Sequence, residues 1–366
     1  MTIAHLSSGY QPRIAALATA VPKHVLDQDA VEKFGKHIFG ENAAMFDRLR
    51  PIYENAGIKT RYSCVDIDWY GQEHTWPERN DLFLEHAVDL LYVAAERCLE
   101  KAELLPSDID GLVIVSTTGI ATPSLDALLM ERMPFRRNVQ RMPIFGLGCA
   151  GGVLGLSRAA ALARATPGSK WLVLVVELCG LTFRRQDMSK SNIVATALFG
   201  DGAAGVVLSG EGAGPAIGVS GEYMWPDTLE VMGWKIKDDG MGVLFRRDIP
   251  DLVRNDMHNA ASEFLGKNHL GVQDIDEFVF HPGGEKVINA LRDCFELPDE
   301  ALRHARSVLR DYGNMSAATV LFVLERALNA GAKGRMLLSA LGPGFTAGFL
   351  TLEASTDVKR SQEMPK

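Results

Sequence analysis

Ser107-Asp-Ile-Asp-Gly-Leu-Val-Ile-Val-Ser116 recurs later in the chain as Gln273-Asp-Ile-Asp-Glu-Phe-Val-Phe-His-Pro282. Each copy follows a stretch with apolar residues at helical spacing, so helices are expected over residues 81–102, with Asn80 as the N-cap, and 252–265. Each copy ends in a short apolar run typical of a buried parallel strand. The repeat therefore predicts the same helix–strand unit in both halves of the chain.

The duplication extends beyond this segment. The further resembling pairs are residues 168–174 with 333–339 and residues 202–208 with 346–352. We therefore expect two related α/β halves, residues 1–212 and 213–366, packed about a pseudo-twofold axis. The Gly-rich stretch 210–215 is their expected junction.

Composition narrows the class of protein. The chain has 366 residues, 47% of them hydrophobic and 23% charged, as is typical of a globular protein, and a net charge of −8 argues against a nucleic-acid partner. No apolar run is long enough to span a bilayer and the first residues do not resemble a secretory signal, so a cytoplasmic protein is expected. Five cysteines without a CxxC pair argue against a disulfide framework and a zinc ribbon, and no metal site is expected.

Cys149 is the first candidate for chemistry. It lies in Phe145-Gly-Leu-Gly-Cys-Ala-Gly-Gly-Val153, ahead of an expected helix over residues 154–165. A cysteine at a helix N-terminus has its thiolate stabilised by the helix dipole, which predicts a lowered pKa and a nucleophile. The alternative is a buried core cysteine beside glycines that allow close helix packing.

His281 and Asn314 are the other two candidates. His281 ends the second repeated strand, and ligand sites form at the carboxyl ends of parallel strands; it is either a partner that holds the Cys149 thiolate or a structural histidine. Asn314 precedes an expected helix over residues 317–330, either as a cap or as an oxyanion donor. The turn at residues 342–346 is either a plain turn or a backbone wall against the site.

Five motifs, in order along the chain, give these residues a common context. They are Gly148-Cys-Ala-Gly-Gly152, Ala197-Leu-Phe-Gly-Asp-Gly-Ala203, Phe280-His-Pro-Gly-Gly284, Tyr312-Gly-Asn-Met-Ser316 and Gly342-Pro-Gly344. Together they resemble the type III polyketide synthases, the chalcone synthase-like family, over roughly residues 12–355.

This resemblance implies a thiolase-like α/β fold with five layers, αβαβα, in a homodimer. It implies acyl-CoA and malonyl-CoA as substrates and no separate cofactor. By motif match Cys149 carries the acyl group, while His281 and Asn314 bind the thioester carbonyl and the enolate left by decarboxylation. Phe199 matches the family's gatekeeper between the coenzyme A tunnel and the cavity.

Departures from the plant pattern make the chain more similar to bacterial members. Cys149 lacks the aromatic residue that follows it in plant enzymes, and Thr122 replaces a methionine that crosses the plant dimer interface. Residues 177–198 resemble those of bacterial alkylresorcinol and alkylpyrone synthases, which implies a medium- or long-chain fatty acyl starter. The matches to substrate-binding positions are Thr117, Thr122, Glu177, Cys179, Thr182, Gly233 and Ser316, with Lys59 and Arg61 for coenzyme A. Thr117, Glu177 and Ser316 match a network that favours aldol ring closure.

Two other interpretations stay open at this point. A β-ketoacyl-acyl carrier protein synthase III shares Cys, His and Asn but performs one condensation, and it typically has His-Gln-Ala-Asn in place of His281-Pro-Gly-Gly284. A noncatalytic thiolase-fold partner subunit is expected to lack one of the three polar residues, and here all three are present.

Overall fold

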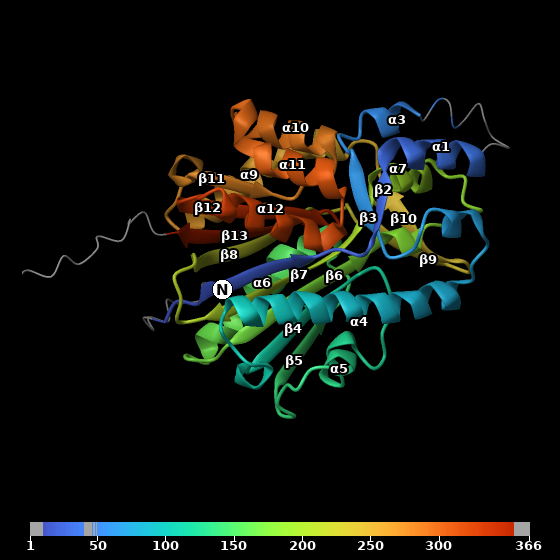
Figure 1. Ribbon diagram of the computed structural model, residues 1–366. Coiled ribbons are helices and arrows are strands. Elements are labelled where there is room, and N and C mark those ends of the chain that lie inside the picture. Colours follow the sequence, from blue (N-terminus) through green and yellow to red (C-terminus); the bar gives the residue numbers. More distant parts are fainter. Residues whose placement is uncertain (1–9, 40–45, 47, 49, 355–366) are drawn as a thin grey trace, which may run out of the picture.

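The computed structural model describes residues 10–39, 46, 48 and 50–354, in which helices and strands alternate (Figure 1). The strands are β1 (Arg13–Ala20), β2 (His24–Asp27), β3 (Thr60–Ser63), β4 (Gly111–Val115), β5 (Gln140–Ile144), β6 (Trp171–Leu178), β7 (Asp201–Ser209), β8 (Ala216–Met224), β9 (Met232–Lys237), β10 (Gly240–Phe245), β11 (Glu277–Phe280), β12 (Gly334–Gly342) and β13 (Thr346–Ala354). The α-helices are α1 (Gln28–Ile38), α3 (Pro51–Glu54), α4 (Trp76–Lys101), α5 (Leu125–Met130), α6 (Gly151–Ala165), α7 (Lys190–Leu198), α8 (Ile249–Leu252), α9 (His258–Lys267), α10 (Glu285–Cys294), α11 (Arg303–Tyr312) and α12 (Thr319–Asn329). The outer ends of the two expected halves, residues 1–9 and 355–366, lie outside the described residues.

Strands of both halves form one mixed sheet of nine strands, in the order β11-β12-β13-β8-β1-β7-β6-β4-β5. β4 is parallel to β5 and β6, and β11 is parallel to β12, as the repeated segments predict; the other neighbours are antiparallel. The strands β1, β4, β6 and β7 of the first half correspond in order to β8, β11, β12 and β13 of the second. β1 and β8 join the two halves edge to edge at Arg13 and Ala216.

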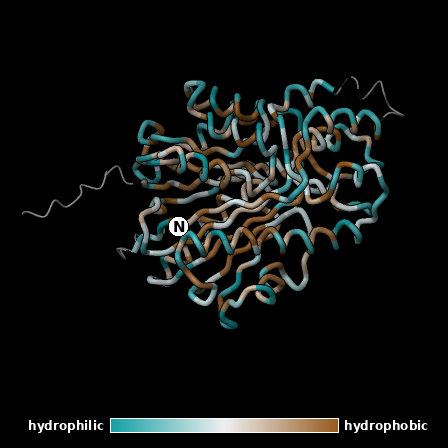
Figure 2. The backbone as a smooth tube through the Cα atoms, viewed as in Figure 1, coloured by the Kyte–Doolittle hydropathy of each residue, from teal (hydrophilic) through white to brown (hydrophobic). Residues whose placement is uncertain are grey.

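Helices cover the sheet on both faces because successive strand residues point to opposite sides. In β6, Leu172 and Leu174 pack with the long outer helix α4, whereas Val173 and Val175 pack with α6. α6 and α12 contact each other and strands of both halves, so they form the central layer. On the far side, Phe264 of α9 stacks on β13. Figure 2 shows the hydrophobic residues concentrated in the central strands.

Two helices differ from those expected from the sequence, one in its N-terminal boundary and one in its continuity. α4 begins at Trp76, not at residue 81, because Thr75 and Glu78 form a capping box. The expected cap Asn80 instead exchanges two hydrogen bonds with the backbone of Ile120. The helix expected over residues 252–265 is α8, then a π-helical turn at Val253–Met257, then α9.

A group of small elements lies at one end of the sheet. Figure 1 shows α1, α3 and α7 gathered there with the short strands β2, β3, β9 and β10. Contacts of α7 with α1, α3 and β10 hold this group together, and the cavity described below opens among these elements. In the part of the chain that the structure describes, no helix is long and apolar enough to cross a membrane.

Candidate active site

Cys149 lies in a tight turn, a 3-10 segment at Gly148–Ala150 that leads directly into α6. Gly148 has φ +46°, and a Cβ there would lie 2.6 Å from the Pro343 ring. A Cβ on Gly342 would lie 2.4 Å from the carbonyl oxygen of Leu147. The turn at residues 342–346 is thus a backbone wall packed against the nucleophile turn, which requires glycine on both sides of the contact.

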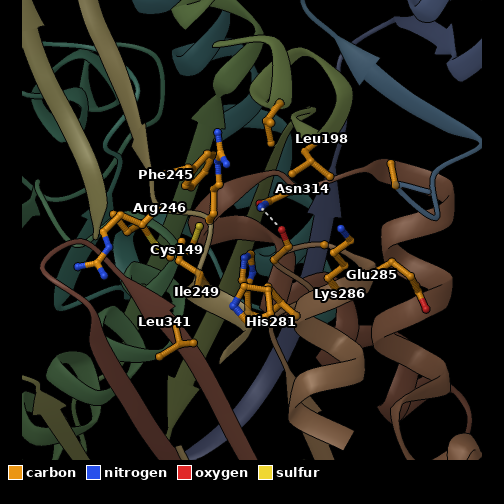
Figure 3. A pocket seen from close by; sticks show the side chains of 18 of the residues that line it. Cys149, Leu198, Phe245, Arg246, Ile249, His281, Glu285, Lys286, Asn314 and Leu341 are labelled. Atoms are coloured by element: carbon orange, nitrogen blue, oxygen red, sulfur yellow. Dashed lines mark hydrogen bonds between the residues drawn. The ribbon is translucent and has the colours of Figure 1, made fainter. Parts of the chain in front are cut away.

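Three side chains from different elements converge on one cavity of about 620 Å³. Cys149 precedes α6, His281 follows β11, and Asn314 precedes the turn into α12; Figure 3 shows all three facing the same space. The structure therefore brings together the three residues that the sequence singled out, at equivalent points of the two halves. The described residues include no cluster of three or more His, Cys, Asp or Glu side chains that could hold a metal ion.

Hydrogen bonding fixes the orientation of the Asn314 amide. Its Oδ1 accepts from the backbone N–H of Ser316 at 2.8 Å, so its NH₂ group is the end turned toward the cavity. That NH₂ group donates one long bond of 3.4 Å to the carbonyl oxygen of Gly283. Asn314 is thus a preorganised donor, as stabilising an oxyanion requires.

Burial keeps the cysteine and the histidine neutral. It raises the pKa of Cys149 to about 12, with a further rise from the Glu177 charge, and it lowers the pKa of His281 to about 3. The direction for Cys149 is opposite to the lowered pKa expected from the helix N-terminus, and desolvation is its largest cause. Neither ring nitrogen of His281 has a hydrogen-bond partner among the described residues, which leaves both available to a substrate or to the Cys149 proton.

Glu177 lies behind the nucleophile at the end of β6 and is fully buried. Its Oε2 accepts from the Thr117 backbone N–H at 3.0 Å and from the Thr118 hydroxyl at 2.8 Å. The Thr117 hydroxyl instead accepts from the Gly148 N–H at 3.1 Å. Thr117 therefore contacts Glu177 through its backbone, and Thr118, adjacent in the chain, supplies the side-chain hydrogen bond.

Phe199 lines a second cavity, separate from the one that contains Cys149. This smaller cavity, of about 80 Å³, is lined by Phe199, Cys179 and Thr182 together with apolar residues of α1 and α7. The Phe199 ring lies 5.7 Å from that of Phe245, which lines the main cavity, and 6.3 Å from that of Trp234. The role of Phe199 as a gatekeeper between the coenzyme A tunnel and the cavity stays a prediction.

Backbone hydrogen bonds tie Phe199 to the catalytic centre. Asn314 donates its N–H to the carbonyl oxygen of Leu198 at 2.8 Å, and Gly200 donates to the carbonyl oxygen of Asn314 at 3.0 Å. Phe199 and Asn314 form an isolated parallel bridge between the two halves. The chain on both sides of Phe199 is therefore fixed relative to Asn314.

Thr122 and Gly233 match substrate-binding positions of the family, but neither residue is among those that line the two cavities. Thr122 is exposed and lines neither cavity. Gly233, with φ +155°, packs near Pro343, while its neighbour Met232 lines the main cavity.

Of the two expected coenzyme A contacts, Arg61 is corrected and Lys59 stays a prediction. Lys59 is exposed and outside both cavities. Arg61 is only 3% exposed, and its guanidinium donates to the carbonyl oxygens of Ala197 and Phe199 at 2.8 and 2.9 Å. Arg61 therefore holds the C-terminal end of α7 and is not a cation at the cavity mouth.

Exposed cations at the rim of the main cavity were missed from the sequence. Lys190, Arg246, Arg247 and Lys286 line it from three separate segments. Arg246 pairs with Asp248, whereas no ion pair involves the other three within the described ranges. These four cations are far apart in the sequence of an acidic chain, so the sequence alone does not predict that they form a cluster. The fold places them at one opening.

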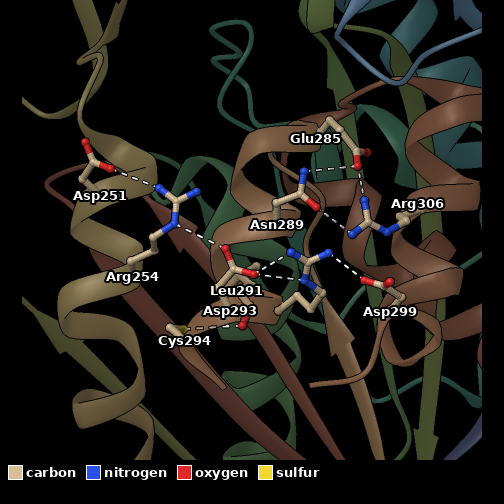
Figure 4. A network of polar contacts seen from close by, with 10 residues as sticks. Asp251, Arg254, Glu285, Asn289, Leu291, Asp293, Cys294, Asp299 and Arg306 are labelled. Atoms are coloured by element: carbon tan, nitrogen blue, oxygen red, sulfur yellow. Dashed lines mark hydrogen bonds and ion pairs between the residues drawn. The ribbon is translucent and has the colours of Figure 1, made fainter. Parts of the chain in front are cut away.

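Ion pairs fix the helix that carries Lys286. α10 starts four residues after His281, and Glu285 at its start pairs with Arg306 of α11 (Figure 4). Farther along, Asp293 lies 3.5 Å from Arg254 of the π-turn. Exposed pairs of this kind contribute little free energy each, but they hold α10 against its neighbours and keep this wall of the cavity in place.

Comparison with family models covers nearly the whole chain. Residues 3–215 match the N-terminal domain of the chalcone and stilbene synthases, and residues 217–354 match their C-terminal domain.

Individual relatives and solved structures agree with these matches. A 1,3,6,8-tetrahydroxynaphthalene synthase of Streptomyces peucetius subsp. caesius is 39% identical over 350 residues, 93% of this chain and 92% of that protein. A 3,5-dihydroxyphenylacetyl-CoA synthase of Amycolatopsis balhimycina is 31% identical over 310 residues, 82% of this chain and 83% of that protein. The crystal structure of the tetrahydroxynaphthalene synthase of Streptomyces coelicolor A3(2), a bacterial type III polyketide synthase, superposes with a TM-score of 0.90 at 28% identity, covering 94% of this chain and all of that one.

These matches favour the type III enzymes over the single-condensation synthases and the noncatalytic subunits. The chain belongs to the chalcone and stilbene synthase family: it is a type III polyketide synthase with a thiolase-like fold, a decarboxylating acyltransferase.

Proposed function

We propose that this enzyme loads a medium- to long-chain fatty acyl group from acyl-CoA onto Cys149, extends it repeatedly with malonyl-CoA, and closes the product to an alkylresorcinol or an alkylpyrone. The observation that carries the fatty acyl starter is the second cavity, which is lined by apolar side chains of α1 and by Phe199 and Val243, with Arg61, Asn192 and Thr196 as polar neighbours. Cys179 and Phe199 of this lining belong to the same apolar cluster as Phe245, which lines the Cys149 cavity. In this proposal the aliphatic chain on Cys149 extends past Phe199 toward this second cavity.

The three polar residues divide the chemistry. The Cys149 thiol transfers its proton to the neutral His281 imidazole as the thiolate attacks the starter thioester, and the imidazolium then gives this proton to the departing coenzyme A thiolate. Malonyl-CoA then binds with its thioester carbonyl toward the Asn314 NH₂ group and the imidazole. Loss of carbon dioxide leaves an enolate, whose oxygen receives these hydrogen bonds, and its carbon attacks the acyl group on Cys149. Donors aimed at such an oxyanion are worth about 3–4 kcal/mol.

The cations at the rim suit the phosphates of coenzyme A. Lys190, Arg247 and Lys286 are exposed, unpaired in the described structure and placed at the opening that leads to Cys149. In a chain with net charge −8, this local positive charge attracts a polyanionic substrate to this opening.

The β5 edge of the sheet supports a homodimer. β5 has a hydrogen-bonded neighbour on one side only, and Phe145 directly after it is 59% exposed. An open strand edge beside an exposed aromatic residue is a surface that a second copy can cover. Light scattering is expected to give twice the chain mass, and Phe145→Asp is expected to weaken the association; a monomer at all concentrations would contradict the proposal.

A second candidate function follows from the relatives. One relative at 39% identity is named for 1,3,6,8-tetrahydroxynaphthalene, a product without an alkyl chain. If this enzyme made such a product from malonyl-CoA alone, the small apolar cavity would not be used.

Starter preference separates the two candidates. Across acyl-CoA starters from acetyl to palmitoyl, we expect kcat/KM to rise by up to about fourfold per methylene, the equivalent of about 0.8 kcal/mol, until the apolar space is filled, and then to fall as longer chains overpack it. Cys179→Trp should shorten the preferred starter, with Cys179→Ser as the matched control that keeps the volume. A maximum at acetyl-CoA or at an aromatic starter, or product from malonyl-CoA alone at an equal rate, would exclude the fatty acyl assignment.

A further inference from the structure

One wall of the main cavity lies outside the nine-stranded sheet. On the nucleophile side, the turn that begins at Ser316 packs against β6, and the Ser316 hydroxyl lies 3.6 Å from Cys149 Sγ. The strands β9 and β10 instead pair with each other as a separate two-stranded sheet. An isolated hairpin is marginally stable in water, so contacts outside the hairpin must fix its position.

The inner face of this hairpin contacts both cavities. The cross-strand pairs that share this face are Trp234 with Val243 and Met232 with Phe245. Met232 and Phe245 line the main cavity, and Val243 lines the second cavity. The rings of Trp234 and Phe245 pack on Phe199. A shift of the hairpin would therefore change the width of both spaces beside Phe199.

Two buried arginines, Arg79 and Arg184, hold the turn of the hairpin. Arg184 is 4% exposed; its guanidinium donates to the Asp239 carboxylate at 2.8 Å and also pairs with Asp187. Arg79 is 6% exposed; it donates to the carbonyl oxygen of Asp239 and, at 2.6 Å, to that of Phe183. The arginine pair therefore ties the hairpin turn to α4 and to the segment that precedes α7.

Glycines on the outer face let the arginine pair reach the hairpin backbone. Gly242 points away from the cavities because its neighbour Val243 points toward them. A Cβ on Gly242 would lie 3.2 Å from Arg184 Nη2, and a Cβ on Gly240 would lie 2.9 Å from Arg79 Nη2. The guanidinium groups thus lie directly against the backbone, so the position of the arginines sets the position of the hairpin.

The segment that carries Arg184 is held in turn by α7. Asn192, which is 3% exposed, donates through its side-chain NH₂ group to the carbonyl oxygens of Arg184 and Asp187, at 2.9 and 2.8 Å. The same helix ends at Phe199, which is its C-cap. α7 therefore fixes the distance between the arginine pair and the Phe199 ring, against which the hairpin packs.

We propose that Arg184 is a positioning residue for chain length: through Asp239 it fixes the β9–β10 hairpin relative to Phe199, and the width of this space limits how many malonyl units the chain on Cys149 acquires. A chain that fills the space is not extended further, because overpacking is unfavourable. Arg184 takes part in no covalent step. The inference rests on the repeated extension in the proposed function and is independent of the starter and of ring closure.

Product length measured by mass spectrometry tests this role. Each enzyme receives a starter that the wild type accepts, with ¹³C-labelled malonyl-CoA, and the malonyl units in each product are counted. Asp239→Ala removes the carboxylate from Arg184 and should raise the fraction of products with an additional malonyl unit by about threefold, as expected for the loss of one half-exposed ion pair. Asp239→Asn keeps an acceptor oxygen and should retain the wild-type fraction. The matched control is Asp238→Ala, which makes the same change of charge at the exposed neighbouring position and should leave the fraction unchanged.

Malonyl-CoA decarboxylation, measured as released carbon dioxide, separates positioning from general damage. All three variants should keep the wild-type rate, because the polar residues that stabilise the enolate lie outside the hairpin. Equal product lengths in Asp239→Ala and Asp238→Ala would overturn the proposal. So would a loss of product and of decarboxylation in the same proportion in Asp239→Ala, which is the result that destabilisation gives.

Arg184→Lys decides the question if Asp239→Ala does not fold. It keeps the charge but loses the fork that reaches Asp187 and Asp239 together, so it should lengthen the products in the same way, and unchanged products would overturn the proposal. Failure of the proposed function has a different result: a wild type that adds a single malonyl unit to every starter would contradict repeated extension itself. Wild-type products with several units that Asp239→Ala does not alter contradict the role of Arg184 alone.

Discussion

Glu177→Gln should change the pH dependence of stability by an amount that follows from burial. The pKa of Glu177 rises from 4.5 to about 7 on folding, because burial penalises the charged form. A carboxyl with a raised folded-state pKa favours folding at low pH, and this contribution is lost as the pH rises through 7. At about 1.36 kcal/mol per pKa unit, the wild type loses about 2.5 kcal/mol between pH 5 and pH 8.5 from this group.

Thermal unfolding of the two proteins across this pH range measures the loss. For a chain of 366 residues, about 2.1 cal/mol/K of unfolding entropy per residue converts the difference to about 3 °C in Tm. E177Q should therefore gain about 3 °C relative to the wild type at pH 8.5, compared with pH 5. Glu263→Gln on the exposed face of α9 is the control and should show no such gain. A Tm difference between E177Q and the wild type that stays constant from pH 5 to 8.5 would refute the reasoning.

The remaining predictions concern activity. Cys149→Ala should abolish polyketide formation while malonyl-CoA decarboxylation persists, measured as released carbon dioxide; full-length product from this variant would remove Cys149 from its role. Thr118→Val should shift the product from resorcinol toward pyrone more than Thr117→Val does, because the Thr118 hydroxyl bonds Glu177; chromatography of the products decides, and equal ratios would contradict this. Lys286→Ala should raise KM for acyl-CoA severalfold but leave that for the N-acetylcysteamine thioester unchanged, and equal effects on both substrates would exclude a phosphate contact.

The duplicated architecture was predictable because it depends on apolar periodicity, which the repeat displays twice. The paired strands β4 and β11 follow from the repeated segments, and the meeting of Cys149, His281 and Asn314 follows from their related positions in the two copies. The start of α4 is also encoded locally, by the capping box of Thr75 and Glu78 three residues apart, whereas Asn80, the cap expected above, lies inside the helix.

Features that depend on burial were not predictable. The direction of the Cys149 pKa shift depends on how much solvent the folded chain removes, and no local pattern reports that. Arg61 was misassigned for the same reason: a motif shows a cation but not the carbonyl oxygens of α7 that it contacts. Lys190 and Lys286 are brought to one opening only by tertiary structure.

The bridge between Phe199 and Asn314 limits how these enzymes can be recombined. One partner descends from the first copy of the duplicated unit and the other from the second, yet the two backbones hydrogen-bond as neighbours. A chimera that joins the first half of one homologue to the second half of another must keep glycine at both Gly200 and Gly313. A Cβ at either position would lie within 3.0 Å of a backbone carbonyl oxygen of the other half. Breakpoints between the halves should therefore be tolerated only among parents that share this contact, so the duplicated copies are constrained to evolve together.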